Sequence, residues 1–206
     1  MNPSLLRRRQ LLFYLGLGLT GAGITNGCGI LSKGISSANQ NSNSSAMPGP
    51  LTTSTEVAAL PPPGKPLPDF QGIQQWLNSK PLSIADLKGK VVLVQFWTFA
   101  CINCQRTLPH ITRWHRQYAE KGLKVIGVHT PEFAFERDPN NIKQAMQKHG
   151  ITYPVPMDND FRTWKAYNNG YWPHLFLADR QGLLRYDHVG EGAYDTTEQT
   201  IRQLLG

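Results

Sequence analysis

Residues 91–104 read VVLVQFWTFACINC, a run of β-branched and aromatic residues that leads into a C-x-x-C motif. The first seven residues of this run are apolar except for Gln95, which is typical of a strand buried on both faces of a sheet. The pattern then changes to helical spacing from Cys101 to Lys121, and Gly122 ends it. The sequence therefore predicts a central strand and a helix that begins at the cysteines. The apolar residues that give this helix a buried face are Leu108, Ile111, Trp114 and Tyr118.

The residues that follow alternate between strand and helix signals. The last two predicted strands are joined by Asp179-Arg180-Gln181-Gly182, a sequence typical of a hairpin turn. Strands that alternate with helices, followed by a hairpin and a last helix, predict the α/β class, with a central mixed β-sheet flanked by helices on both faces. The predicted strands are residues 123–128, 175–177 and 183–186, and the predicted helices are residues 141–149, 161–167 and 196–205.

Cys101 and Cys104 lie three residues apart at the start of the predicted helix. Residues at this spacing are neighbours on a helix, so the two sulfurs are within reach of a disulfide. Cys101 also faces the unpaired N–H groups and the positive end of the helix dipole, which stabilise a thiolate. We therefore expect Cys101 to be the nucleophile that attacks a substrate disulfide and Cys104 to resolve the mixed disulfide. Apart from this redox-active disulfide, no cofactor is expected.

A C-x-x-C motif is also half of many zinc sites, and His110 and His115 lie downstream as further ligands. Zinc fingers usually place about a dozen residues between the cysteine pair and the histidine pair, so that the chain can fold back. Here only five residues separate Cys104 from His110, and all four side chains fall on one predicted helix. No metal site is therefore expected.

Residues 94–104, with Pro109 after them, resemble the active-site strand and helix of the thioredoxin superfamily. Far downstream, Trp172-Pro173 lies just before a predicted strand and resembles the cis-proline of that family. The resemblance implies a thioredoxin-like fold in which Trp172 and Pro173 lie against the cysteine pair and hold the substrate chain as an added strand. An ordinary trans proline at the start of a strand is the alternative. Trp97 is expected beside the pair, where it shields the cysteines and contacts the substrate, or else has a core role alone.

Within this superfamily the chain is most similar to the exported TlpA/ResA-like branch, which has an insertion of roughly 25 residues between the second strand and the cis-proline strand. Residues 130–135, 171–173 and 190–194 resemble, more narrowly, the soluble thioredoxin-like domain of DipZ-type cytochrome c biogenesis proteins. The resemblance covers residues 68–206. It implies a thiol:disulfide oxidoreductase for exported proteins, a reductase rather than an oxidase or isomerase, with apocytochrome c as the substrate class. Nothing resembles the membrane part of DipZ, so electrons are expected from a separate membrane donor of the CcdA/DsbD type.

Two acidic residues that these relatives use near the second cysteine are replaced here. Thioredoxins have a buried Asp where this chain has Gln95, and ResA-like reductases have a Glu where this chain has Thr107. Glu132, just after the second strand, is the expected proton acceptor, because the carboxyl ends of neighbouring strands converge on one edge. A solvated or helix-capping Glu132 is the alternative. His129 and His174 are expected to be packed or hydrogen-bonded rather than catalytic.

Residues 1–27 are expected to be a targeting segment, with Arg7-Arg8-Arg9 followed by a short apolar run that resembles a signal peptide of the twin-arginine type. Cys28 follows small residues and is a lipidation candidate, the alternative being an unmodified cysteine in a leader. Residues 28–67 are rich in Ser, Asn, Gly and Pro and are expected to be a flexible tether to residues 68–206. The protein is therefore expected at the extracytoplasmic side of a bacterial membrane, in a periplasm or lumen, held there by the N-terminal anchor or by a lipid.

Composition and motif context weigh against other functions. The formal net charge is +7 and the pI is near 9.5, but no run of basic residues interleaved with aromatic ones follows residue 10, so no nucleic-acid partner is expected. A copper-binding metallochaperone is the alternative function, because Sco-like proteins use cysteines on this fold and thiolates favour Cu(I), although their motif resembles C-x-x-x-C. The full Pro-x-x-x-Thr-x-x-Cys context of a peroxiredoxin is absent.

Overall fold

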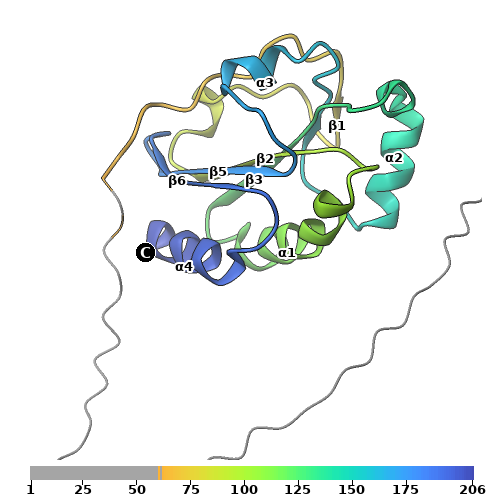
Figure 1. The fold of residues 1–206 in the computed structure, drawn as a ribbon. Helices are drawn as coiled ribbons and strands as arrows, with labels where there is room; N and C mark the ends of the chain where they lie inside the picture. The colour runs from red at the N-terminus through yellow and green to blue at the C-terminus, as the bar shows by residue number, and fades with distance from the viewer. Residues whose placement is uncertain (1–59, 61) are drawn as a thin grey trace, which may run out of the picture. The chain divides into compact units, whose positions relative to one another are not determined.

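The strand at the centre of the sheet is β2 (Val91–Trp97), and all seven of its residues are buried in the computed structural model, which describes residue 60 and residues 62–206. It pairs in parallel with β3 (Leu123–His129) and antiparallel with β5 (His174–Ala178), which in turn pairs antiparallel with β6 (Leu184–Val189). The order of the four strands is β3-β2-β5-β6 (Figure 1). The predicted α/β class with a mixed central sheet is thereby confirmed.

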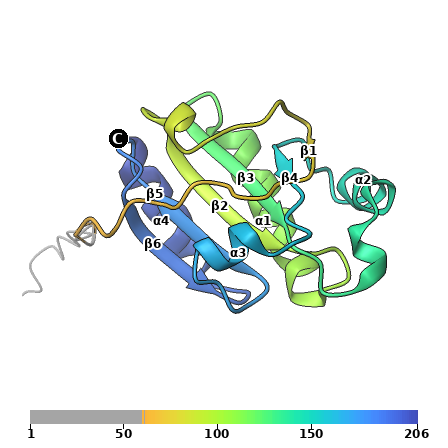
Figure 2. The ribbon, with the colours of Figure 1, turned by 90° about the horizontal axis from the view of Figure 1, so that it is seen from above.

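Helices cover both faces of this sheet (Figure 2). One face carries α1 (Ile102–Tyr118) and α4 (Tyr194–Leu205), and the opposite face carries the short α3 (Arg162–Ala166) and the chain that leads into β2. Helix α2 lies beside a separate two-stranded antiparallel sheet. The remaining elements are α2 (Pro139–Lys148), β1 (Trp76–Leu77), β4 (Val155–Pro156) and the 3-10 helices η1 (Ala85–Leu87) and η2 (Ala134–Arg137).

The alternation of side chains along β2 divides the apolar interior into two layers. Leu93 and Trp97 point into the layer beneath α1 and α4, together with Cys104. Val94 and Phe96 point into the opposite layer. Both layers are closed to solvent, which explains why β2 is apolar on both faces.

A buried carboxylate ties α1 to α4 on the first of these faces. Glu198 of α4 accepts hydrogen bonds at 2.7–3.1 Å from four side chains, those of Arg113, Trp114, Tyr118 and Arg202. Burial alone raises the pKa of this carboxylate, but its four donors outweigh burial and lower the pKa to about 2. Glu198 is therefore an anion that bridges two helices distant in sequence.

The observed elements differ from the predicted ones mainly at their ends. Helix α1 begins one residue later than predicted, because Cys101 is its N-cap and accepts a hydrogen bond from the Cys104 N–H. It ends at Tyr118 rather than Lys121, and Gly122 (φ +107°) follows in the left-handed region. Between β3 and β5 the inserted chain forms η2, α2, β4 and α3. Neither η2 nor β4 was predicted, since such short elements leave no measurable hydrophobic period.

The predictions for residues 1–27, for Cys28 and for most of the tether lie outside the described residues. The last part of the predicted tether, however, is ordered against the domain. The N–H of Gly64 donates to the Leu184 carbonyl at 2.7 Å, and the N–H of Leu67 donates to the Gly182 carbonyl at 3.0 Å. The folded domain thus begins a few residues before residue 68. Among residue 60 and residues 62–206, no helix has both the length and the apolar character needed to cross a bilayer.

Candidate active site

Cys101 is half-buried at the N-terminus of α1, where the structure holds it as a free thiol. Its sulfur lies 3.3 Å from the Cys104 backbone nitrogen and 3.9 Å from the Trp172 carbonyl oxygen. The hydrogen bond from the Cys104 thiol lowers the pKa of Cys101 to about 7, with smaller help from the N–H groups of Cys104 and Asn103 and against the effect of burial. Cys101 is therefore the member of the pair that forms a thiolate near neutral pH.

Cys104 differs from Cys101 in both exposure and acidity. It is fully buried, one turn along α1, in the same core cluster as Trp97 and Leu108. Burial raises the pKa of the Cys104 thiol far above its ordinary value, the hydrogen bond to Cys101 raises it further, and only the Thr98 backbone N–H opposes them among the nearest groups. The two cysteines are thus chemically unequal in the reduced protein, as the roles predicted from sequence require.

The acidity of Cys101 leads to a pH prediction. Of the two cysteines among the described residues, iodoacetamide should alkylate only Cys101 in the reduced protein, and the rate should rise with pH and level off above a midpoint near 7, because the thiolate is the nucleophile. Stopped-flow alkylation with peptide mapping checks both points. A midpoint near the 9.0 of an ordinary cysteine, or labelling of Cys104 in the folded protein, would contradict the assignment.

The Trp172–Pro173 segment faces the cysteine pair from the loop before β5. Its peptide bond is cis, and the Trp172 carbonyl is the group that lies against the Cys101 sulfur. The Trp172 indole N–H donates to the Thr130 carbonyl at 3.0 Å, and the ring packs against Trp164 with centroids 4.2 Å apart. Trp172 is therefore fixed on both sides, and Pro173 behind it is buried.

Trp97, which was predicted to contact the substrate, does not lie at the surface. It is fully buried, and its indole N–H donates to the Gly127 carbonyl at 3.1 Å. Because strand alternation turns it into the layer that holds Cys104, it cannot contact a substrate, and that part of the prediction is wrong. Its packing beside the buried cysteine agrees with the core role.

Glu132, the proton acceptor expected from sequence, is exposed. Its charge is close enough to raise the pKa of Cys101 slightly, and its backbone N–H donates to Glu136 at 2.7 Å. The role of Glu132 stays a prediction.

Glu136 is the functional candidate that sequence reasoning missed. It is fully buried, in η2, and its carboxylate accepts from the Thr98 hydroxyl and from the Ala100 N–H, both of which belong to the chain between β2 and Cys101. On the other side of the Thr98 hydroxyl, the His129 ring nitrogen Nε2 lies 3.4 Å away. Burial lowers the pKa of His129 to about 4, so this ring is neutral at pH 7. The sequence gives no sign that Glu136 rather than Glu132 is the buried residue, and only the three-dimensional fold distinguishes them.

The two positions where relatives have acids are occupied as follows. Gln95 is fully buried on the face of β2 that carries Leu93 and Trp97, and within residues 62–206 neither side-chain polar atom has a hydrogen-bond partner. Thr107 is buried, and its hydroxyl donates to the Asn103 carbonyl one turn back in α1 at 2.9 Å. Neither side chain supplies a carboxylate to Cys104.

His110, His115 and His174 contact neighbouring side chains. The ring of His110 stacks on Tyr194 with centroids 3.5 Å apart, and His115 contacts Tyr153 edge-on. His174 Nδ1 lies 2.7 Å from the Asn169 side-chain oxygen. In the part of the chain that the structure describes, no group of three or more His, Cys, Asp or Glu residues is arranged to hold a metal ion.

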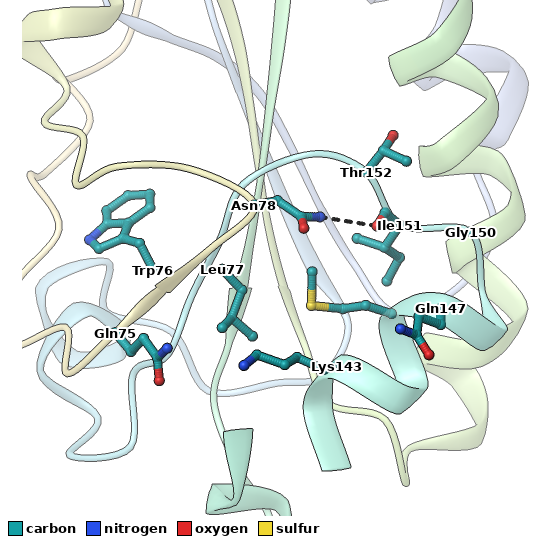
Figure 3. Close-up of a pocket in the computed structure, with 10 residues that line it drawn as sticks. Gln75, Trp76, Leu77, Asn78, Lys143, Gln147, Gly150, Ile151 and Thr152 are labelled. Carbon is teal, nitrogen blue, oxygen red and sulfur yellow. Dashed lines mark hydrogen bonds between the residues drawn. The ribbon is translucent and has the colours of Figure 1, made fainter. Parts of the chain in front are cut away.

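A hollow of about 650 Å³ lies between β1 and α2 (Figure 3). It is lined by polar and apolar side chains such as Gln75, Leu77 and Lys143, and Asn78 closes one end by donating to the Ile151 carbonyl at 3.1 Å. Neither cysteine lines it, so it is separate from the redox site.

Exposed apolar side chains lie on the segments next to the redox site. We call the exposed side chains of Ile102, Phe133, Phe135 and Tyr171 the apolar rim. Ile102 and Tyr171 adjoin Cys101 and Trp172 in sequence and are 57% and 62% exposed. Phe135 stacks on Phe133 and also contacts Phe99. Phe99 in turn packs on the core cluster that contains Cys104. A face of this kind is typical of a surface that contacts another polypeptide.

Comparisons with known proteins agree with this geometry. Residues 63–187 match the AhpC/TSA family. The chain is 49% identical over 141 residues to protein DipZ of Mycobacterium bovis, a stretch that covers 67% of the chain and 20% of DipZ. It is 28% identical over 141 residues to the thiol-disulfide oxidoreductase YkuV of Bacillus subtilis, covering 68% of the chain and 95% of YkuV. The crystal structure of a thiol-disulfide isomerase from Corynebacterium glutamicum matches with a TM-score of 0.61 and 29% identity, over 68% of the chain and 97% of the isomerase. The chain thus spans about a fifth of the length of DipZ.

Proposed function

The chain belongs to the AhpC/TSA family and is related to thiol-disulfide oxidoreductases, and from this premise we propose that it reduces disulfide bonds of exported proteins by dithiol–disulfide exchange. The resemblance to DipZ and to the TlpA/ResA-like branch, and the thioredoxin-like fold, are confirmed. The observation that carries the proposal is the inequality of the two cysteines. Cys101 is accessible with a pKa of about 7, whereas Cys104 is buried and held as a thiol.

The exchange takes place in two steps. The Cys101 thiolate attacks one sulfur of the substrate disulfide; a bond forms between Cys101 and that sulfur, the substrate S–S bond breaks, and the second sulfur leaves as a thiolate that takes a proton from water. Cys104 then loses its proton and attacks the Cys101 sulfur. The bond from Cys101 to the substrate breaks, the substrate sulfur leaves as a thiolate that takes up a proton, and the Cys101–Cys104 disulfide forms, so that two electrons have passed to the substrate.

The proposed substrates are polypeptides rather than small disulfides. The apolar rim and the Trp172 carbonyl beside Cys101 support this, because an extended chain can bind an open backbone group while its side chains contact the rim. Apocytochromes c are the proposed class, on the resemblance to DipZ-type proteins. The oxidised pair would be reduced again by a membrane donor of the CcdA/DsbD type, with the protein tethered at the extracytoplasmic side of the membrane through its N-terminus.

The reduction potential tests the proposed direction. Equilibration of the pair with glutathione should give a value near that of thioredoxin, roughly −270 mV, and the reduced protein should reduce insulin stoichiometrically. A value near −120 mV would make the protein an oxidant and overturn the reductase assignment. Stoichiometric Cu(I) retained by the reduced protein, without any insulin reduction, would point to the metallochaperone instead.

A further inference from the structure

Glu136 connects two segments that meet at the redox site. One carboxylate oxygen, Oε1, accepts from the Thr98 hydroxyl and from the Ala100 N–H at 2.9 Å. The other, Oε2, accepts from the N–H groups of Glu132 and Phe133 at 2.7 and 2.8 Å. The first pair of donors lies on the strand exit that leads directly into Cys101, and the second pair lies in the inserted chain that carries part of the apolar rim. A single side chain thus fastens the nucleophile loop to the insertion.

The hydrogen-bond donors around this carboxylate fill both of its oxygens. A carboxylate only accepts hydrogen bonds, and the four O–H and N–H donors match that capacity. All four donors are neutral, and the negative charge is therefore not cancelled by them. The segment after β3 consequently brings a buried carboxylate to the end of β2.

The Glu136 carboxylate acts on Cys104. The titratable and charged groups that face the Cys104 thiol are Cys101 from the helix N-terminus, Glu136 from η2 and, through Thr98, the neutral ring of His129 from β3. The charge of Glu136 adds to burial in disfavouring the Cys104 thiolate. Exposed Glu132 acts on Cys101 rather than on Cys104.

We propose that Glu136 is a positioning residue of the redox site: it clamps the strand exit before Cys101 to the insertion, and its carboxylate adds to the burial that already keeps Cys104 a thiol. The reduced protein then has one nucleophile rather than two. This role rests on the proposed exchange function and explains how a chain without the acids of its relatives at Gln95 and Thr107 still controls its second cysteine.

The test compares Glu136→Gln with Glu120→Gln, a matched change at an exposed carboxylate on the turn after α1. Each protein is loaded with 5-thio-2-nitrobenzoate on Cys101, and release of the dye by Cys104 is followed by stopped flow from pH 5 to pH 10. In Glu136→Gln the rate profile should move to lower pH by about one unit, which is about tenfold in the thiolate fraction of Cys104 at a fixed pH. If the variant only loosens the contact between the two segments, the maximum rate of dye release should fall while the midpoint pH stays the same. The shift in midpoint pH therefore measures the effect of the charge separately.

The reduction potential is the second readout. Removing a negative charge near the pair stabilises the anionic reduced form, so the potential of Glu136→Gln should become less negative, by about 30 mV for a tenfold change in the equilibrium constant. The role of Glu136 would be contradicted if folded Glu136→Gln kept the wild-type pH–rate profile and reduction potential. It would also be contradicted if Glu120→Gln showed equal shifts. A shift confined to Glu132→Gln would assign it to Glu132.

Thr98→Val covers the case in which Glu136→Gln does not fold, since it removes one donor and keeps the charge. Its insulin reduction should fall severalfold without any displacement of the profile to lower pH, and wild-type rates would contradict the clamp. If the wild-type protein releases the dye but does not reduce insulin, the proposed function fails while the role of Glu136 in resolution is still measured.

Discussion

The Cys101→Ser variant should lose disulfide exchange by at least about a thousandfold, because the serine hydroxyl does not ionise near neutral pH and no other exposed thiol is present among the described residues. Cys104 cannot replace it, since it is buried and its pKa is far above the ordinary range. Insulin reduction, measured at pH 7 with a chemical reductant as the electron source, gives the loss directly.

The companion variant Cys104→Ser separates the two steps of the reaction. It keeps the attacking thiolate and lacks the resolving thiol, so it should accumulate as mixed disulfides between Cys101 and its substrates. Mass spectrometry of the trapped conjugates identifies the substrate proteins. The double variant Cys101→Ser/Cys104→Ser is the control and should trap nothing. Absence of conjugates with Cys104→Ser, in cells where the protein is expressed and folded, would count against dithiol exchange.

Glu198→Ala should lower the free energy of unfolding by about 3 kcal/mol, or roughly 10 °C in Tm. The change leaves the Trp114 indole N–H and the Tyr118 hydroxyl buried without their acceptor and removes the partner of two arginines. Thermal and urea unfolding measure the loss. Glu191→Ala is the matched control, because its ion pair with Arg106 is exposed and should be worth less than about 1 kcal/mol.

The pH dependence of stability gives an independent check on Glu198. Its pKa is lowered from the ordinary value of 4.5 to about 2 in the folded state, so its contribution is complete above pH 4.5 and is lost as the pH falls towards 2. The wild-type protein and Glu198→Ala should therefore approach one another in stability across that window. A difference that stays constant from pH 7 down to pH 2 would show that the variant acts through packing rather than through charge.

The centre of the fold and the redox pair were predictable because their signals are local. The run from Val91 to Trp97 is long and apolar enough to predict a strand without knowledge of its neighbours. The cysteines follow after three intervening residues, at a spacing that fits the start of a helix. Their unequal acidity follows from the same placement, with one sulfur at the helix terminus and the other a turn deeper.

The surroundings of the pair were not predictable, because they depend on contacts between distant segments. Thr98 and Glu136 are 38 residues apart and meet only because η2 folds back over the end of β2. Two glutamates follow the second strand, and the sequence contains nothing to show that the first is exposed and the second buried. The error for Trp97 has another cause: its type suggested a binding residue, while the alternation of β2 had already assigned it to the interior.

The chain segment that precedes the domain has a consequence for association. Residues 64–67 pair with the start of β6, and Met157 forms a bridge with His129 at the end of β3, so both outer strands of the sheet are partly covered. Uncovered strand edges recruit other chains and lead to aggregation. Under the proposed function, the protein meets unfolded, disulfide-bearing polypeptides that have such edges. Because both outer strands of the sheet are partly covered, these polypeptides would pair with the Trp172 backbone beside Cys101 instead of with a sheet edge. The protein would then be less prone to aggregate together with its proposed substrates.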